Sequence, residues 1–240
     1  MTHFSAAKFG PTVSAQRRFS SKGYLSLYLT LGMLVLVIAF SFFADITEDV
    51  VSGDSSVKFD ETVATYFHER ATPAMITTMK AISFFGSSAF IIPVTVLIAI
   101  SLWWRRKMYA LASVVLVVGG GTLLNLAIKQ AIHRHRPVFA HPIATLSSYS
   151  FPSGHTMDST LLYGLLAVFF AMSARSAAAK LAGFIAAGVV VALVGLSRIY
   201  LGLHYLTDVL GAMAAGVAWL ALCLTAVELH RHRKVARRQG

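Results

Sequence analysis

The sequence is poor in charged residues and in cysteine. Asp, Glu, Lys and Arg make up only 13% of the 240 residues, while 56% are hydrophobic. A soluble globular domain carries about 25% charged residues, so this composition excludes a soluble domain and indicates an integral membrane protein. The single cysteine, Cys223, excludes an intramolecular disulfide, and its apolar neighbours favour a packing role.

Acidic residues are especially few, with 10 Asp and Glu against 21 Lys and Arg. A formal net charge of +11 can indicate a protein that binds nucleic acid. Here, however, the basic residues are divided among short segments between apolar runs and do not gather in one soluble region. This distribution indicates that the basic residues set the orientation of the chain in a membrane. We therefore predict no nucleic acid partner.

Six apolar runs are of a length that suits membrane spans. They cover residues 23–43, 88–104, 108–128, 157–172, 181–196 and 205–227. Residues 39–41 resemble a signal-peptide cleavage site, but the first run is longer than the usual signal core and further runs follow. We therefore predict an all-α, polytopic membrane protein with a six-transmembrane-helix bundle. Residues 23–228 form one membrane domain, between a basic N-terminus (1–22) and a basic tail (229–240).

The distribution of charge predicts the orientation of these spans. Fourteen of the 21 Lys and Arg lie in segments that the six spans place on one side: 1–22, 105–107, 175–180 and 231–238. Basic loops mark the cytoplasmic side, so both termini are predicted to be cytoplasmic in the plasma or inner membrane. Residues 45–86, on the other side, carry seven of the 10 acidic residues. Phe59, Val63 and Phe67 recur there at helical spacing, which predicts a short extracytoplasmic amphipathic helical segment between the first two spans.

Three polar segments on the extracytoplasmic side contain the residues that can support chemistry. They read Lys129-x6-Arg136-Pro137, Pro152-Ser153-Gly154-His155 and Ser197-Arg198-x5-His204-x3-Asp208. An ionised residue at a membrane edge is costly unless it is paired. If a helix begins near His204, Asp208 lies one turn further along the same face. Its carboxylate can then accept from one ring nitrogen and leave the other free.

These segments suit an anionic ligand. The Pro-Ser-Gly turn before an apolar run exposes backbone N–H groups, which favour a negative charge together with the helix dipole. Lys129, Arg136 and Arg198 add three cations, so phosphate is the predicted ligand. His204 can attack phosphorus as a nucleophile, while His155 protonates the departing oxygen and later activates water. This scheme needs no metal and no other cofactor.

Together, the three segments resemble the signature of the type 2 phosphatidic acid phosphatase (PAP2) family, in its bacterial membrane lipid phosphatase branch. All eleven signature residues are present between Lys129 and Asp208. The resemblance implies a membrane lipid phosphatase with an extracytoplasmic site, a phosphohistidine intermediate and a lipid phosphate substrate. It implies that His204 is the nucleophile, that Asp208 orients it and that His155 is the acid and base. The residues implied to bind phosphate are Lys129, Arg136, Ser153, Gly154 and Arg198.

The resemblance leaves the substrate open and does not exclude every other class of protein. Its bacterial members act on undecaprenyl diphosphate, phosphatidylglycerol phosphate or phosphatidic acid, of which we favour undecaprenyl diphosphate. A lipid phosphotransferase would use the same site with an acceptor other than water. A vanadate-dependent haloperoxidase has a similar anion site but is soluble, and a non-enzymatic membrane scaffold would tolerate loss of the site.

Other polar residues have structural interpretations. The resemblance is silent on His133, Arg134, His135, His141 and Asp158. Residues 133–135 suit a position near lipid head groups better than a zinc site, because no thiolate or carboxylate accompanies them in the sequence. Asp158 is expected to cap the fourth span.

Overall fold

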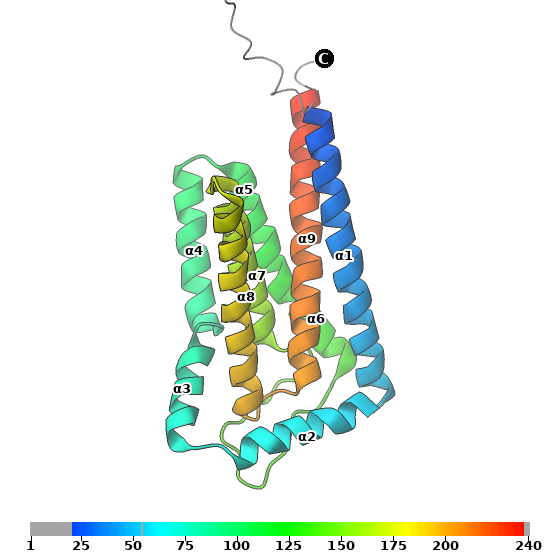
Figure 1. Cartoon of the computed structure of the whole chain (residues 1–240), viewed down its shortest axis with the longest axis vertical. Coiled ribbons are helices and arrows are strands. Elements are labelled where there is room, and N and C mark those ends of the chain that lie inside the picture. Colours follow the sequence, from blue (N-terminus) through cyan, green and yellow to red (C-terminus); the bar gives the residue numbers. More distant parts are fainter. Residues whose placement is uncertain (1–20, 54, 238–240) are drawn as a thin grey trace, which may run out of the picture.

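The computed structural model describes residues 21–53 and 55–237 and shows a bundle of α-helices (Figure 1). The described residues contain no strand, so the predicted all-α fold is confirmed. The helices are α1 (Ser21–Ser52), α2 (Ser55–Glu69), α3 (Pro73–Phe84), α4 (Ser88–Trp104), α5 (Met108–Val114), α6 (Gly120–Ile132), α7 (Gly154–Ser173), α8 (Ala177–Tyr200) and α9 (Leu206–Ala236). A π-helical segment, Val115–Gly119, joins α5 to α6. The predicted basic N-terminus lies almost entirely outside the described residues.

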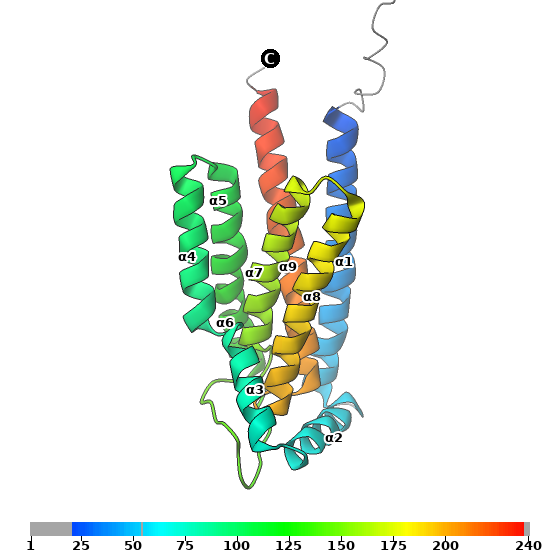
Figure 2. The same cartoon turned by 60° about the vertical axis from the view of Figure 1, so that its left-hand side comes forward.

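Six stretches of the described residues are long and apolar enough to cross a membrane. They are formed by α1, by α3 with α4, by the α5 to α6 stretch, and by α7, α8 and α9. α1 packs on α9, and α7 packs on both α8 and α9 (Figures 1 and 2). The predicted six-helix membrane bundle is confirmed. The end of the bundle that contains α2 is called the α2 end. The other end, where α9 stops, is called the opposite end.

Two helices extend well beyond their apolar runs. α1 runs to Ser52, past the predicted end of the first span at residue 43, so Asp45, Glu48 and Asp49 lie on its last turns. Gly53 follows with φ +73°, and its N–H donates to the Asp49 carbonyl oxygen at 3.1 Å. α9 likewise continues to Ala236, past the predicted end at residue 227. An apolar run marks the part of a helix that suits the bilayer, but polar residues can continue the same helix into water.

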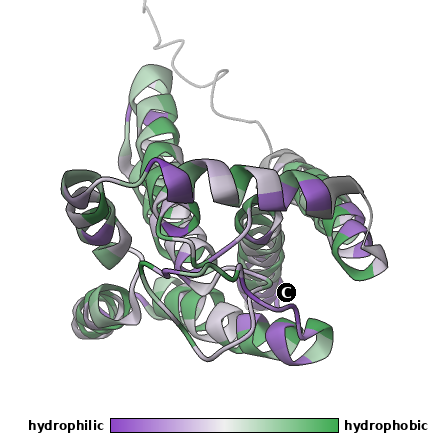
Figure 3. Ribbon diagram, turned by 90° about the horizontal axis from the view of Figure 1, so that it is seen from below, coloured by the Kyte–Doolittle hydropathy of each residue, from purple (hydrophilic) through white to green (hydrophobic). Residues whose placement is uncertain are grey.

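The segment between α1 and α4 forms two helices at the α2 end. α3 begins after Thr72, whose hydroxyl caps it. α2 crosses the end of the bundle, as Figure 3 shows from that side. The predicted amphipathic helical segment is therefore present. One member of its apolar stripe, Phe59, is exposed, whereas Asp60 and Ala64 are buried. A buried acid on α2 indicates a partner elsewhere in the protein.

Close packing between α6, α7 and α9 supports the core of the bundle. A Cβ atom added to Gly121 would lie 2.3 Å from Leu161 of α7, and one added to Gly120 would lie 2.8 Å from Trp219 of α9. The indole of Trp219 donates to the Leu116 carbonyl oxygen in the π-helical segment at 3.0 Å. The glycines therefore allow α6 to approach its neighbours closely.

The start of α7 differs from the prediction. Ser153 is its N-cap residue, so the helix begins before the predicted span at residue 157. Asp158, predicted as a cap, lies in the second turn instead. Its Oδ1 atom accepts from Thr122 Oγ1 of α6 at 3.0 Å. The prediction was wrong because the apolar run begins about one turn after the helix itself.

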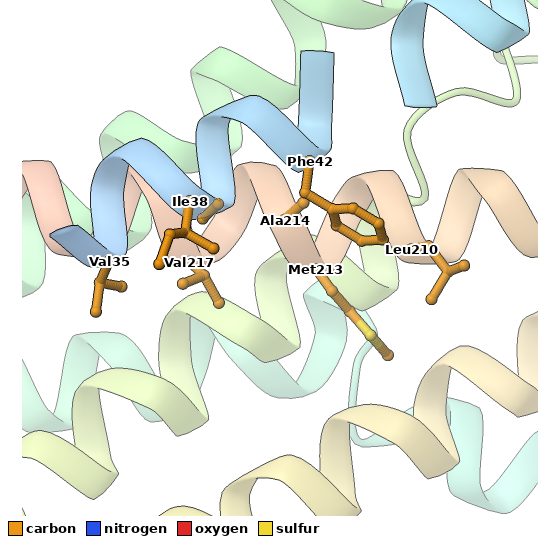
Figure 4. A pocket seen from close by; sticks show the side chains of 8 residues that line it. Val35, Ile38, Phe42, Leu210, Met213, Ala214 and Val217 are labelled. Carbon is orange, nitrogen blue, oxygen red and sulfur yellow. The ribbon is translucent and has the colours of Figure 1, made fainter. Parts of the chain in front are cut away.

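Apolar grooves run along the bundle. One groove of about 360 Å³ lies between α1 and α9, and Figure 4 shows Phe42, Leu210 and Met213 among its lining side chains. A larger groove of about 620 Å³, lined by α1, α7, α8 and α9, shares Val35, Met213 and Val217 with it. Because their linings are almost wholly apolar, both grooves suit hydrocarbon chains.

Candidate active site

A turn between α8 and α9 holds His204. Gly202 adopts φ +69° in this turn, a left-handed conformation that favours glycine. α9 begins only at Leu206, so His204 precedes the helix. Asp208 Oδ2 accepts from the Tyr205 N–H at 2.9 Å, and the same oxygen lies 3.4 Å from His204 Nδ1. The histidine is 2% exposed and the aspartate 0%, so water does not screen this pair.

The protonation of the His204 ring follows from its neighbours. Arg136 Nη1 lies 3.1 Å from His204 Nε2. A guanidinium only donates hydrogen bonds, so Nε2 is the acceptor and the ring proton is on Nδ1, facing Asp208. Burial lowers the pKa of His204 to about 4; Asp208 opposes this shift, and the charges of Arg136 and Arg198 add to it. The ring is therefore uncharged at neutral pH, with a lone pair on Nε2.

The end of α6 and the segment that follows it hold two cationic side chains beside this ring. Lys129, buried at the end of α6, donates from Nζ to the Tyr149 carbonyl oxygen at 2.6 Å. Arg136 donates to the carbonyl oxygens of Ser148 at 2.7 Å and Leu203 at 2.5 Å. Backbone acceptors thus orient both cations without neutralising their charge.

Arg198 supplies a third cation from the last turn of α8. Its Nη1 donates to the Ser83 hydroxyl of α3 at 2.7 Å. Its Nε is buried and has no hydrogen-bond partner among the described residues. A buried donor without an acceptor is rare in proteins. This nitrogen therefore indicates a place for an acceptor such as a phosphate oxygen.

The first turn of α7 places His155 among the same groups. Its ring lies close enough to His204, Arg198, Arg136 and Lys129 to interact with their charges. These five side chains come from α6, the following segment, α7, α8 and the turn before α9. The structure thus brings the predicted reactive histidines and cations together at the α2 end.

The Pro-Ser-Gly turn also lies at this end, but one of its backbone donors is engaged. The Ser153 N–H donates to the Asp208 carbonyl oxygen at 3.0 Å, which ties the start of α7 to α9. The Ser153 hydroxyl accepts from Thr156 Oγ1 at 3.0 Å. Any contact from Ser153 to an anion would therefore use its hydroxyl, whereas Gly154 opens the helix as its first residue.

A buried arginine that the sequence motifs do not include contacts Asp208 directly. Arg134 Nη1 donates to Asp208 Oδ1 at 2.6 Å and to Thr207 Oγ1 at 2.7 Å. Its Nη2 donates to Asp60 Oδ2 of α2 at 2.8 Å. Burial lowers the pKa of Arg134, but the two carboxylates more than offset this effect and raise it above the usual value. Its side chain is only 9% exposed, unlike the surface position predicted for residues 133–135.

Asp60 is the second site residue that the motifs do not reveal. Besides Arg134, it accepts from the Thr207 N–H at 3.0 Å and from the Thr207 hydroxyl. Its position on an otherwise amphipathic helix was a weak signal, because nothing in the sequence shows which face of α2 is covered. His133 and His135, by contrast, are exposed.

Fold and site together define a membrane protein with a buried histidine and carboxylate pair among three cationic side chains, a set of groups suited to phosphoryl transfer. The chain belongs to the PAP2 superfamily, whose family model matches residues 107–231. The family that the sequence motifs resemble is thereby confirmed. The chain is a membrane phosphatase of the phosphoric monoester hydrolase class.

Similar proteins agree with this membership. Phosphatidylglycerophosphatase B of Bacillus subtilis is 40% identical over 147 residues, which cover 60% of this chain and 71% of that protein. A crystal structure of a transmembrane PAP2 type phosphatidylglycerolphosphate phosphatase from Bacillus subtilis has a TM-score of 0.71 at 32% identity, over 82% of this chain and 96% of that one. Aquifex aeolicus LpxE shares the fold, with a TM-score of 0.54 at 20% identity over 69% of this chain and 94% of that one.

Proposed function

We propose that the protein removes a phosphate group from a membrane lipid by forming a phosphohistidine at His204. The orientation of the His204 ring supports this most directly. Nδ1 carries its proton toward Asp208, and the Nε2 lone pair faces the cation Arg136. A neutral nucleophile therefore points to the place where an anion would bind.

The cations would form the phosphate site. Lys129, Arg136 and Arg198 surround the phosphate oxygens, and Arg198 Nε gains the acceptor that it lacks. The Ser153 hydroxyl and the start of α7 at Gly154 add donors. Because Arg136 contacts Nε2 in this structure, its guanidinium must turn from the ring to the phosphate when a substrate binds.

The two histidines would then divide the chemistry. His204 Nε2 forms a bond to phosphorus while the bond from phosphorus to the lipid oxygen breaks, and His155 donates a proton to that oxygen. Asp208 stabilises the positive charge that develops on the His204 ring. His155 next takes a proton from water, the water oxygen bonds to phosphorus, and the bond to Nε2 breaks to release inorganic phosphate. Protein groups supply each proton and charge in these steps, so the scheme includes no metal or other cofactor.

For the substrate, we propose phosphatidylglycerol phosphate, in line with the name of the Bacillus subtilis relative. The apolar grooves beside α9 would accommodate lipid chains near the site. Undecaprenyl diphosphate, which we favoured from the sequence, is the second candidate. Three cations close to one ring also suit the larger negative charge of a diphosphate.

We further propose that the site faces the extracytoplasmic side and that both termini are cytoplasmic. Residues 105–107 and 175–180 and the basic end of α9 lie at the opposite end of the bundle from the site, as the helix order requires (Figure 1). Basic residues accumulate on the cytoplasmic side of membrane proteins. Residues 23–228 would form one membrane domain, although α9 continues into the proposed basic tail from 229.

Phosphate release by the purified protein tests the proposed function. The lipids compared are phosphatidylglycerol phosphate, undecaprenyl diphosphate and phosphatidic acid, each with and without a chelator. We expect His204→Ala to abolish release, and His135→Ala, an exposed histidine near the same end, to leave it unchanged. Labelled phosphate trapped on the protein should be lost in acid and should be absent from His204→Ala.

The outcome also separates the alternative classes. Full activity in His204→Ala would overturn the phosphohistidine, and activity that disappears with chelator would overturn the metal-free scheme. A phosphotransferase would release less free phosphate when an alcohol acceptor is added. A scaffold would release none from any lipid.

A further inference from the structure

The two oxygens of Asp208 contact different groups. Oδ2 faces His204 Nδ1 at 3.4 Å and accepts from the Tyr205 N–H at 2.9 Å. Oδ1 accepts from Arg134 Nη1 at 2.6 Å. Oδ2 also accepts from the buried Ser150 hydroxyl. The ion pair through Oδ1 fixes the other oxygen, so together these contacts keep the carboxylate from rotating and hold Oδ2 on the histidine side.

Asp60 shares the same guanidinium. Arg134 Nη2 donates to Asp60 Oδ2 at 2.8 Å, so one arginine lies between two carboxylates. Both carboxylates are fully buried, and Thr207 bonds to Arg134 as well as to Asp60. The Tyr205 ring also covers the Arg134 guanidinium, whose central carbon lies 4.5 Å from the ring centroid. Such a network, once every member has a partner, is rigid.

We propose that Asp60 and Arg134 are positioning residues, which hold Asp208 in the orientation that serves His204 and balance its negative charge. The proposal rests on the proposed function, in which His204 is the nucleophile. If Arg134 paired with Asp208 alone, its charge would cancel the negative field that the carboxylate exerts on the ring. Because Asp60 takes a share of that positive charge, Asp208 keeps enough negative charge to stabilise the ring as it becomes cationic.

Other charged groups also face His204, and they come from every element around it. Asp208 faces it from α9, Arg136 from the segment after α6, Arg198 from α8 and His155 from α7. Asp60 and Arg134 lie behind Asp208 as seen from the ring. Substitutions at these two positions leave the chemical identity and charge of the directly facing groups unchanged, so differences between variants report on the network that holds and balances Asp208.

Opposite charge changes should have opposite effects on the pH profile. Asp60→Asn removes a negative charge and leaves Arg134 unbalanced, so protonation of His204 becomes harder. In the pH profile of kcat/KM, the fall in activity on the acid side (the acid limb) should then shift to lower pH by about half to one pH unit. Arg134→Gln removes the positive charge, so protonation becomes easier and the limb should move up by a similar amount. The double variant restores the net charge and should return the limb close to that of the wild type.

A conservative variant separates position from charge. Arg134→Lys keeps the charge but cannot bind both carboxylates through a planar fork. It should keep the wild-type acid limb while kcat falls by about tenfold or more, because the carboxylate is no longer held in place. Glu228→Gln is the matched control. Glu228 pairs with Arg231 and His232 at the opposite end, and its substitution should change neither quantity.

The measurement is the pH dependence of phosphate release, with the melting temperature of each variant recorded in parallel. The substrate ionises identically in all assays, so only differences between variants count. Limbs that do not move, or that move in the same direction in Asp60→Asn and Arg134→Gln, would overturn the inference. If Arg134→Gln does not fold, Asp60→Asn and Arg134→Lys still decide it.

Failure of the inference can be told from failure of the proposed function. An inactive His204→Ala combined with unmoved limbs would leave the phosphohistidine standing and reject the network's role. An active His204→Ala would reject the proposed function itself. In that case the His204 ring can be titrated by NMR in histidine-labelled protein, and a pKa that does not respond to Asp60→Asn would reject the network's role as well.

Discussion

Arg198 donates through Nη1 to the hydroxyl of Ser83 at 2.7 Å, while its buried Nε has no partner among the described residues. Ser83 lies on α3 and Arg198 at the end of α8, so a contact between two distant segments orients the guanidinium. One edge of the arginine is bound within the protein, and the other remains available for an anion.

Ser83→Ala should weaken anion binding more than it slows chemistry. Without the hydroxyl, Arg198 loses the side-chain acceptor that orients it among the described residues, and its guanidinium samples other orientations. The loss of one hydrogen bond to a charged group corresponds to about 1.5 to 3 kcal/mol, so inhibition by inorganic phosphate should weaken roughly tenfold or more. Ser87→Ala is the control, because the Ser87 hydroxyl donates to the nearby Phe84 carbonyl oxygen, away from Arg198. Equal inhibition constants in both variants would contradict the expected role of Ser83.

Asp208→Asn should reduce kcat by about 10³-fold to 10⁴-fold. The amide can donate a hydrogen bond to Nδ1, which favours the tautomer with the proton on Nε2 and removes the nucleophilic lone pair. Steady-state phosphate release measures the loss, and the melting temperature shows whether the protein remains folded. A loss below tenfold would show that the carboxylate does not orient the ring.

Stability should depend on pH through His204. Its pKa is about 4 in the folded protein, against about 6.5 for a free histidine, so the unfolded chain binds the extra proton first. The buried neutral ring therefore contributes about 3 kcal/mol to the free energy of unfolding above pH 6.5. This contribution falls as the pH drops from 6.5 to 4 and is lost below pH 4. Unfolding of wild type and His204→Asn in detergent across this range checks the prediction. The variant should show a shallower pH dependence, and parallel curves would contradict it.

Gly202→Ala should destabilise the turn that carries His204. An alanine at φ +69° costs about 1 to 2 kcal/mol, and its Cβ would also lie 3.0 Å from the Phe139 ring. We expect a lower melting temperature and a fall in kcat, because the ring is displaced from Asp208. Gly188→Ala is the control, since no described atom lies within 4 Å of its added Cβ on α8. Similar melting temperatures in the two variants would show that the turn tolerates a side chain.

The proposed orientation in the membrane can be tested with introduced thiols. Ser147→Cys lies in the exposed segment before α7, and Ala178→Cys is exposed at the start of α8 at the opposite end. The native Cys223 is buried and should react slowly. A membrane-impermeant thiol reagent should label residue 147 in intact cells and residue 178 only after lysis. The reverse pattern would place the site on the cytoplasmic side.

Much of the fold was predictable because the bilayer imposes a simple pattern. An apolar run of suitable length specifies a helix, and the six runs correspond to the six stretches that can span a membrane. The ends of α1 and α9 were not predictable from hydropathy, because Asp45, Glu48 and the basic residues after 228 continue helices in water. The start of α7 at Ser153 was missed because its first turn is polar although buried, and the apolar run begins only after it.

The site was predictable only where its residues form local motifs. His204 and Asp208 are four residues apart, and both were identified from their spacing. Arg134 and Asp60 are separated by 74 residues, and their contact depends on how α2 crosses the bundle end. Ser83 and Arg198 are 115 residues apart. Long-range contacts of this kind follow from packing, which the hydrophobic pattern of a single sequence does not specify.

The family model matches residues 107–231, yet Asp60 and Ser83 both lie before that region. The first helices of the chain are therefore more than a membrane anchor for a self-sufficient catalytic unit. A transplant of residues 107–231 onto unrelated leading helices would carry every motif residue but would leave Arg134 without its second carboxylate and Arg198 without its hydroxyl partner. In this chain, the unit that would have to be moved to preserve the site is thus larger than the segment by which its family is identified.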